Sequence, residues 1–242
     1  MSGPGELQQC GTAATQRQQC HTAATPTGRG QSGRVQITHY GHSCLLLDTG
    51  AARLLVDPGG FSAGFDDLTG LDAVLVTHQH PDHLAPDRLT PLLRANPDAR
   101  LIVDAGSAVQ LSGIDHEVVG PGATLHLAGA RVEVLGGEHA VIHPEIPVIP
   151  NNAYLVDGTH LHPGDAFAQA PGPVEVLFLP TAAPWLKLAD AVDYLRAVAP
   201  RTAVPIHEAL LAKPGLFYGL FEKLAPDATA VRVLDREVPT TL

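Results

Sequence analysis

Residues 71–83, LDAVLVTHQHPDH, join an apolar run to a cluster of three histidines and one aspartate. The aliphatic residues predict a short buried strand that ends at Thr77. Residues two apart on extended backbone point in the same direction, so His78 and His80 can bind one ion together. The stretch therefore predicts a metal site at the end of a strand.

The second half of this cluster lies beyond Pro81, which bends the chain and allows Asp82 and His83 to face a second ion nearby. Imidazole and carboxylate together suit Zn²⁺, and also Mn²⁺ or Fe²⁺. Random placement at this composition would give the pattern His-x-His-x-Asp-His about 0.002 times per chain. A solvated polar loop therefore explains the cluster poorly.

The rest of the chain after residue 34 consists of short β-patterned runs separated by Gly, Pro and Asp. Strands are expected over residues 35–40, 43–48, 53–57, 72–77, 100–103, 124–128, 131–136, 153–157, 174–179, 202–206 and 230–234. Helices are expected over residues 86–95, 105–112, 186–198 and 216–224. Many strands with a few interspersed helices predict a mixed α/β layered domain.

The run over residues 77–83 resembles the signature of the metallo-β-lactamase superfamily, and further motifs follow in that family's order. They are Tyr40–Cys44 with Leu55–Pro58 in the opening hairpin, then Gly136–His139, Leu161–Asp165 and Val204–His207. The resemblance covers about residues 34–235. It implies an α/β fold of the αββα four-layer sandwich type.

This resemblance also implies a site for two divalent metal ions, Zn²⁺ ahead of Mn²⁺. The implied ligands are His78, His80, Asp82, His83, His139, Asp165 and His207. Asp165 would bridge both ions through its two carboxylate oxygens. Asp82 and Asp165 are the predicted catalytic residues.

Within the superfamily, three details are similar to the L-ascorbate-6-phosphate lactonase-like hydrolases. They are the runs YGHS at 40–43 and NNAY at 151–154, and the Pro-Trp step that ends at Trp185. Metallo-β-lactamases proper often use a cysteine in the second metal site. Here Cys44 lies in the opening strand and Asp165 takes the bridging position, so antibiotic hydrolysis is disfavoured.

Several residues near the motifs allow two interpretations. Asp57 could begin a turn before a proline, or orient a ligand imidazole through the free ring N–H. His42 and Ser43 would point to opposite faces of a strand, so they are expected to serve packing and not to cooperate. Glu208 could protonate a leaving group, although a carboxylate at a helix start is the simpler account.

The proline-rich residues 143–150 lie between two ligand motifs and are a candidate wall of a substrate pocket. Trp185 is a second candidate, and ordinary packing would explain both. His143 and His162 could touch substrate, but each is expected to be a loop or strand histidine.

The first 33 residues differ in composition from the rest and contain one large aliphatic residue, Leu7. Such a segment cannot bury enough apolar area to offset its ordering entropy. A disordered extension over residues 1–33 is therefore expected, followed by a hydrolase domain over 34–242. Metal binding by Cys10, Cys20 and His21 is the disfavoured alternative.

Composition narrows the range of partners. A net charge of −10 without a local basic patch disfavours nucleic acid as a partner. No stretch approaches the roughly 20 apolar residues of a membrane helix, and the N terminus lacks the pattern of a signal peptide. The expectation is a cytoplasmic protein that acts on a small molecule, with exposed apolar helices that could support a homo-oligomer.

The predicted function is hydrolysis of a small-molecule ester, lactone, amide or phosphodiester by a metal-bridging hydroxide. The alternative enzyme class is a mononuclear iron oxidoreductase similar to persulfide dioxygenases. A third class is a binding protein on a degenerate scaffold. The complete set of implied ligands favours the dinuclear hydrolase.

Overall fold

The computed structural model describes Met1 and residues 35–242. The extension predicted over residues 1–33 therefore lies outside the described residues, apart from Met1. Within residues 35–242, no helix is both long enough and apolar enough to cross a membrane.

The first sheet is built mainly from the N-terminal half of the chain. Its strands are β1 (Gln36–Gly41), β2 (Cys44–Asp48), β3 (Arg53–Val56), β4 (Ala73–Leu75), β5 (Arg100–Val103), β6 (Glu117–Val118) and β14 (Thr240–Thr241). They are arranged in the order β14-β1-β2-β3-β4-β5-β6. β3 to β6 are parallel, so the carboxyl ends of β3 and β4 lie at the same edge. Asp57 follows β3 at that edge, and His78 follows β4.

The second sheet is built from the C-terminal half. Its strands are β7 (Thr124–Leu127), β8 (Ala130–Glu138), β9 (Pro150–Val156), β10 (His160–His162), β11 (Val176–Pro180), β12 (Thr202–Ile206) and β13 (Ala230–Val231). They are arranged in the order β13-β12-β11-β10-β9-β8-β7. β8 and β10 both run antiparallel to β9, and β10 to β12 are parallel. The ends of β8, β10 and β12 therefore share one edge, where His139, Asp165 and His207 follow.

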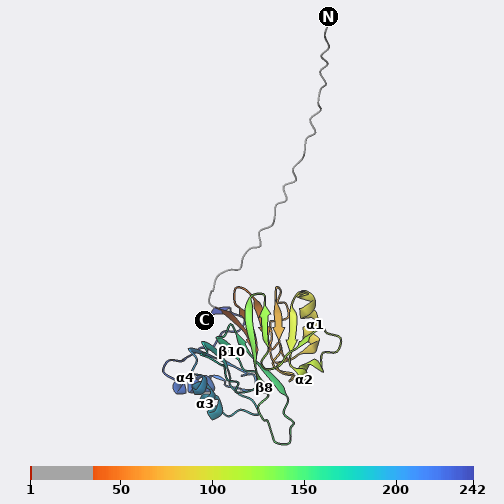
Figure 1. The fold of residues 1–242 in the computed structure, drawn as a ribbon. Coiled ribbons are helices and arrows are strands. Elements are labelled where there is room, and N and C mark those ends of the chain that lie inside the picture. Colours follow the sequence, from red (N-terminus) through yellow and green to blue (C-terminus); the bar gives the residue numbers. More distant parts are fainter. Residues whose placement is uncertain (2–34) are drawn as a thin grey trace.

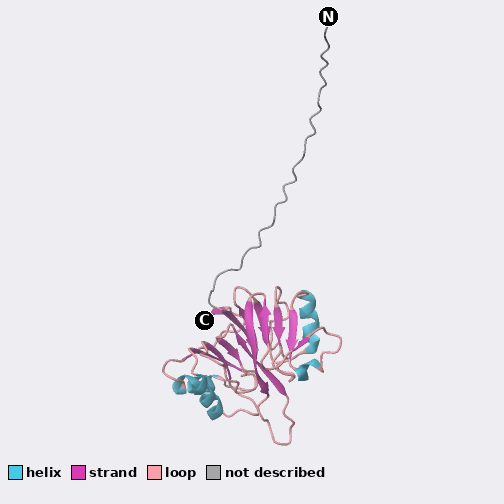
Figure 2. Cartoon of the chain, viewed as in Figure 1, coloured by secondary structure: helices cyan, strands magenta, loops and turns pink. Residues whose placement is uncertain are grey.

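Each sheet buries both faces, which gives four layers. Helices α1 (Pro86–Ala95) and α2 (Ala105–Ala108) lie outside the first sheet, and α3 (Leu188–Val198) and α4 (Gly215–Leu224) lie outside the second (Figures 1 and 2). Alternate residues of β2 show why: Leu45 and Leu47 pack in the core between the sheets, whereas Leu46 packs with the helix residue Leu89. On the opposite side, Leu195 of α3 packs with Leu177 of β11. The predicted αββα sandwich is therefore the observed fold.

The predicted elements match the observed ones with a few differences. All eleven expected strands and all four helices are present. However, the strand expected over residues 230–234 ends at Val231, the strand expected to end at Thr77 ends at Leu75, and the helix expected over residues 105–112 ends at Ala108. β6, β10 and β14 were not predicted. Each has only two or three residues, and two of the three in β10 are histidines, so their sequences carry no β-pattern.

Candidate metal centre

A first group of three histidines combines residues that follow strands of both sheets. Donor atoms of His78, His80 and His139 all lie within 4.8 Å of one another. Nε2 of His78 faces Nδ1 of His80 at 3.0 Å. His78 and His80 follow β4 of the first sheet, and His139 follows β8 of the second. The sequence predicted these three residues as ligands of one ion, and the fold places them together.

A second group lies beside the first. It contains Asp82, His83 and His207, which were predicted as ligands, and also His42, which was not. Nε2 of His207 lies 3.5 Å from Oδ2 of Asp82, and Nε2 of His83 lies 3.9 Å from the same oxygen. The four donor atoms lie within 4.8 Å of one another, a spacing that one ion could fill.

Asp165 lies between the two groups, as a bridging carboxylate would. Its Oδ1 is 3.2 Å from Nε2 of both His83 and His207 in the second group. Its Oδ2 is 3.5 Å from Nε2 of His139 in the first group, and accepts a hydrogen bond of 2.8 Å from Nε1 of Trp185. One carboxylate therefore presents a different oxygen to each group.

The outer ring nitrogens of three predicted ligand histidines are held by acceptors. Nδ1 of His83 donates to Oδ2 of Asp57 at 2.7 Å. Nδ1 of His139 and Nδ1 of His207 donate to the carbonyls of Ala140 and Ala182, each at 2.6 Å. An imidazole that donates through Nδ1 keeps its lone pair on Nε2, so these contacts fix the tautomer that binds a metal.

The inner atoms fit a pair of cations. Among the described residues, Nε2 of His83, His139 and His207 and Oδ1 of Asp165 are buried and lack a hydrogen-bond partner. A buried polar atom without a partner is costly, so four of them within these two neighbouring groups require an explanation. Bound metal ions would satisfy all four.

Electrostatics support the same conclusion. Burial holds the pKa of His78 well below its usual value, so this imidazole is neutral and able to bind metal. Burial also opposes protonation of His83, but the carboxylates of Asp165 and Asp57 outweigh it and raise the pKa of His83 well above its usual value. The second group therefore favours a positive charge, which a divalent cation would supply in place of a proton.

Asp57 has the orienting role that was one of its two predicted interpretations. Its side chain is fully buried and accepts from the backbone N and Oγ1 of Thr77, at 2.7 and 2.8 Å, as well as from His83. The turn that carries it passes very close to the metal-binding run. A Cβ on Gly59 would lie 1.8 Å from the carbonyl oxygen of Asp82, so only glycine fits there.

His42 differs from its prediction as a packing residue. It lies in the turn between β1 and β2 with a positive φ of 50°, and not in a strand. The turn directs its buried ring into the site, where Nε2 lies 2.9 Å from Oδ2 of Asp82. Ser43 is buried, and its hydroxyl has no hydrogen-bond partner among the described residues. The alternation of strand side chains does not apply to a left-handed turn residue, which is why the sequence argument failed.

The structure also places the other polar residues that the sequence left open, Glu208, His162 and His143. Glu208 does not begin a helix: Oε1 accepts from the backbone N of His42 and from Arg236. His162 is a buried strand histidine, as expected, with Nε2 at 3.0 Å from the carbonyl of Ser43. His143 lies exposed in the loop after β8.

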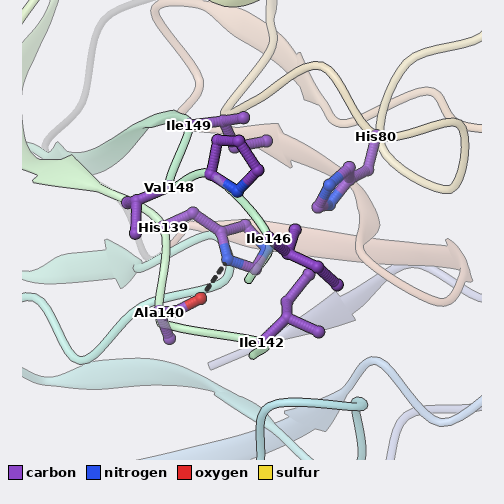
Figure 3. Close-up of a pocket in the computed structure, with 8 residues that line it drawn as sticks. His80, His139, Ala140, Ile142, Ile146, Val148 and Ile149 are labelled. Carbon is purple, nitrogen blue, oxygen red and sulfur yellow. Dashed lines mark hydrogen bonds between the residues drawn. The ribbon is translucent and has the colours of Figure 1, made fainter. Parts of the chain in front are cut away.

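A pocket opens beside the first group. Figure 3 shows that His80 and His139 line this pocket together with aliphatic side chains of the loop between β8 and β9. It is lined by His80, His139, Ala140, Ile142, Ile146, Pro147, Val148 and Ile149. Trp185 also packs on His139, edge to face, with ring centroids 6.0 Å apart. Both elements that were candidate walls thus lie against a predicted ligand.

Comparison with known proteins gives consistent matches. The model of the "Beta-lactamase superfamily domain" family matches residues 36–207. Protein Rv0786c of Mycobacterium tuberculosis is 51% identical over 86% of this chain and 100% of its own length. A UPF0173 metal-dependent hydrolase of Methylobacterium nodulans is 26% identical over 83% of this chain and 92% of its own.

Solved structures support the fold. Igni18, a metallo hydrolase from the archaeon Ignicoccus hospitalis, superposes with a TM-score of 0.68. The match covers 86% of this chain and 98% of that one at 21% identity.

Proposed function

This chain belongs to the beta-lactamase superfamily domain family, and from that membership we propose that it is a dinuclear metal-dependent hydrolase of small molecules. Relatives named as metal-dependent hydrolases support the reaction class. The observation that carries the two-metal proposal is Asp165, which presents Oδ1 to one group of histidines and Oδ2 to the other. The hydrolase domain would span residues 34–242.

In this proposal, His78, His80 and His139 hold one ion, Asp82, His83 and His207 hold the other, and Asp165 bridges them. Divalent cations such as Zn²⁺ or Mn²⁺ would supply Lewis acidity there and bring the pKa of a bound water toward neutrality. The site therefore requires no serine or cysteine nucleophile.

The chain's own residues fix the polar groups around the reaction. Trp185 donates to Oδ2 of Asp165 and so sets the plane of the bridging carboxylate. Burial raises the pKa of Asp82, but the hydrogen bond from His42 and nearby histidines outweigh it and bring that pKa to about 2. Asp82 is then a carboxylate at neutral pH. It can orient a water or bind a cation, but so weak a base holds no proton to give to a leaving group.

The bond cleaved is proposed to be an ester, lactone, amide or phosphodiester, in an enzyme built like the L-ascorbate-6-phosphate lactonase-like hydrolases. The NNAY run at residues 151–154 supports that architecture. Oδ1 of Asn151 accepts from the backbone N of Asp165, and Nδ2 donates to the carbonyl of Pro163. This asparagine thus shapes the turn that carries the bridging carboxylate.

The test combines metal analysis with turnover. Protein purified without chelator should contain about two zinc or manganese ions per chain and hydrolyse generic ester, lactone or phosphodiester substrates. His80→Ala and Asp165→Ala should lose metal and at least 10³-fold in turnover while circular dichroism stays unchanged. The matched control is His126→Ala, because His126 is exposed on β7.

Full activity in both variants, or a chain that binds no metal, would overturn the proposal. One iron per chain with oxygen consumption and no hydrolysis would assign the protein to the oxidoreductases instead.

A further inference from the structure

We propose that the pocket beside His80 and His139 binds an uncharged aliphatic group of the substrate, such as the acyl or alkyl chain of an ester or lactone. This inference rests on the proposed hydrolase function and names the substrate class for the same site. It is argued from the exposed aliphatic side chains, the stiff loop and the lack of lysine and arginine in the segments that carry most of the predicted ligands.

The pocket is small and has an aliphatic lining. Its cavity volume is about 60 Å³, well below that of a pocket for a drug-sized ligand, so it is suited to a short group and not to a whole large substrate. Two of its lining residues, Ile146 and Val148, expose 47% and 46% of their surface. Ile142 and Ile149 complete the wall that faces the histidines in Figure 3. Aliphatic side chains clustered in one loop beside a reactive centre indicate a binding surface more than a core.

The loop holds these side chains in place. Prolines at residues 144, 147 and 150 restrict its backbone. The backbone N of Ile146 donates to the carbonyl of His143, and that of His139 donates to the carbonyl of Ile149, both at 2.9 Å. A wall that is already ordered loses little entropy when a ligand binds, so contact with an apolar group is gained at low cost.

The charges around the site argue against an anionic substituent. No lysine or arginine occurs in residues 54–87 or in residues 132–186, which together supply every predicted ligand except His207. The arginines that flank the site are already paired: Arg88 with Asp66, and Arg236 with Glu208. Phosphate groups are usually bound by such cations, so the pocket is suited to a neutral group and not to a phosphorylated sugar.

The position of the pocket next to the predicted metal ligands determines which part of the substrate would occupy it. His80 and His139 are at once pocket walls and predicted ligands, so the pocket opens directly onto the metal centre. A chain attached to the attacked carbon would therefore extend along Ile146 and Val148. An apolar group placed there would gain about 0.8 kcal/mol per methylene removed from water, which is about fourfold in kcat/KM.

The first experiment is a chain-length series of 4-nitrophenyl esters, from acetate to octanoate, with the protein as purified. We expect kcat/KM to rise about fourfold per methylene over the first few carbons and then level off as the pocket fills. Ile146→Ser and Val148→Ser should flatten this slope, and a slope that stays at about fourfold per methylene in both variants would overturn the proposal. Leu216→Ser is the matched control, because Leu216 is 66% exposed on α4 and should keep the slope.

The second experiment measures binding without turnover. Titration of 1-hexanol into methyl-labelled protein should shift the methyl signals of Ile142, Ile146 and Val148, and 1-hexanol should displace no metal. Such shifts in a protein that hydrolyses no ester, lactone, amide or phosphodiester substrate would support the pocket and refute the proposed function. Hydrolysis with a flat chain-length series and no methyl shifts would refute the pocket and leave the function standing. A change of Ile146→Ser from dimer to monomer with an unaltered slope would overturn the proposal in favour of self-association.

Discussion

Asp57→Asn should weaken the second metal site through the tautomer of His83, although Asp57 itself binds no metal in the proposed site. Oδ1 of Asp57 accepts from the backbone N of Thr77, so the oxygen of an asparagine must occupy that position. The NH₂ group then takes the place of Oδ2, 2.7 Å from Nδ1 of His83. Two donors cannot face each other, so His83 would move its proton to Nε2 and lose the lone pair that a metal needs.

The size of the effect follows from these contacts. To bind an ion, His83 must return its proton to Nδ1 and leave a buried N–H without an acceptor. An unsatisfied buried donor costs about 1–3 kcal/mol, which is roughly 5- to 150-fold in affinity. Substitution of residues that orient metal ligands generally costs about 10- to 100-fold, in agreement with this range.

The assay is titration of metal-free protein with Zn²⁺, followed by calorimetry and by the fluorescence of Trp185. Trp185 is the only tryptophan in the chain and donates a hydrogen bond to Asp165, so its emission should report metal binding. The first ion should bind Asp57→Asn within about threefold of its normal affinity, and the second should bind about 10- to 100-fold more weakly. Asp48→Asn is the control, since Asp48 caps a surface turn through Gly50. Normal affinity for both ions in Asp57→Asn would refute the tautomer argument.

Three further predictions concern neighbouring positions. In urea unfolding, Gly59→Ala should lower the free energy of unfolding by about 4 kcal/mol or more, because its Cβ would overlap the Asp82 carbonyl. The control is Gly172→Ala, which has open space around it and should change the free energy of unfolding by no more than about 0.5 kcal/mol. His42→Asn keeps a side chain that tolerates positive φ but removes the contact with Asp82. Zinc titration should show about tenfold weaker binding of the second ion only, and equal weakening of both ions would contradict the placement of His42. Burial, with Arg236, lowers the pKa of His39 from 6.5 to about 4. The free energy of unfolding should therefore be highest above pH 6.5 and fall by up to about 3 kcal/mol as the pH drops to 4, because only the unfolded chain binds a proton at His39 in this range. His39→Gln should make the free energy of unfolding less dependent on pH, and an unchanged pH profile would count against the argument.

Much of the candidate site could be predicted from the sequence because its residues follow strands. His78 and His80 follow an apolar β-run, and their spacing alone predicts that they share an ion. The ligand roles of His139, Asp165 and His207 came from the resemblance in the order of motifs along the chain. The two sheets and their helices were predictable for the same reason, since the apolar periodicity of their elements is strong.

What the sequence missed depends on backbone conformation and on contacts between distant segments. His42 reaches the site only because its φ is positive, and nothing in the run YGHS distinguishes such a turn from a strand. The hydrogen bond between Trp185 and Asp165 joins residues twenty positions apart, and neither the residues nor their spacing specify it. Asp57 had two interpretations because a carboxylate before proline is common in turns, and only its contact with His83 decides between them.

The ligands of each proposed ion come from both halves of the chain. In the first group His139 alone belongs to the second sheet, and in the second group His207 does. The ions would therefore act as removable cross-links between two halves that otherwise meet through an apolar core and a few backbone contacts, such as that between Asn152 and Thr77. A ligand that binds only the docked halves stabilises their docking by RT ln(1 + [L]/Kd). Removal of the ions by a chelator should thus weaken the packing between the two halves before either half unfolds. A mutation that destabilises either half should be detected first as faster dissociation of the metal ions.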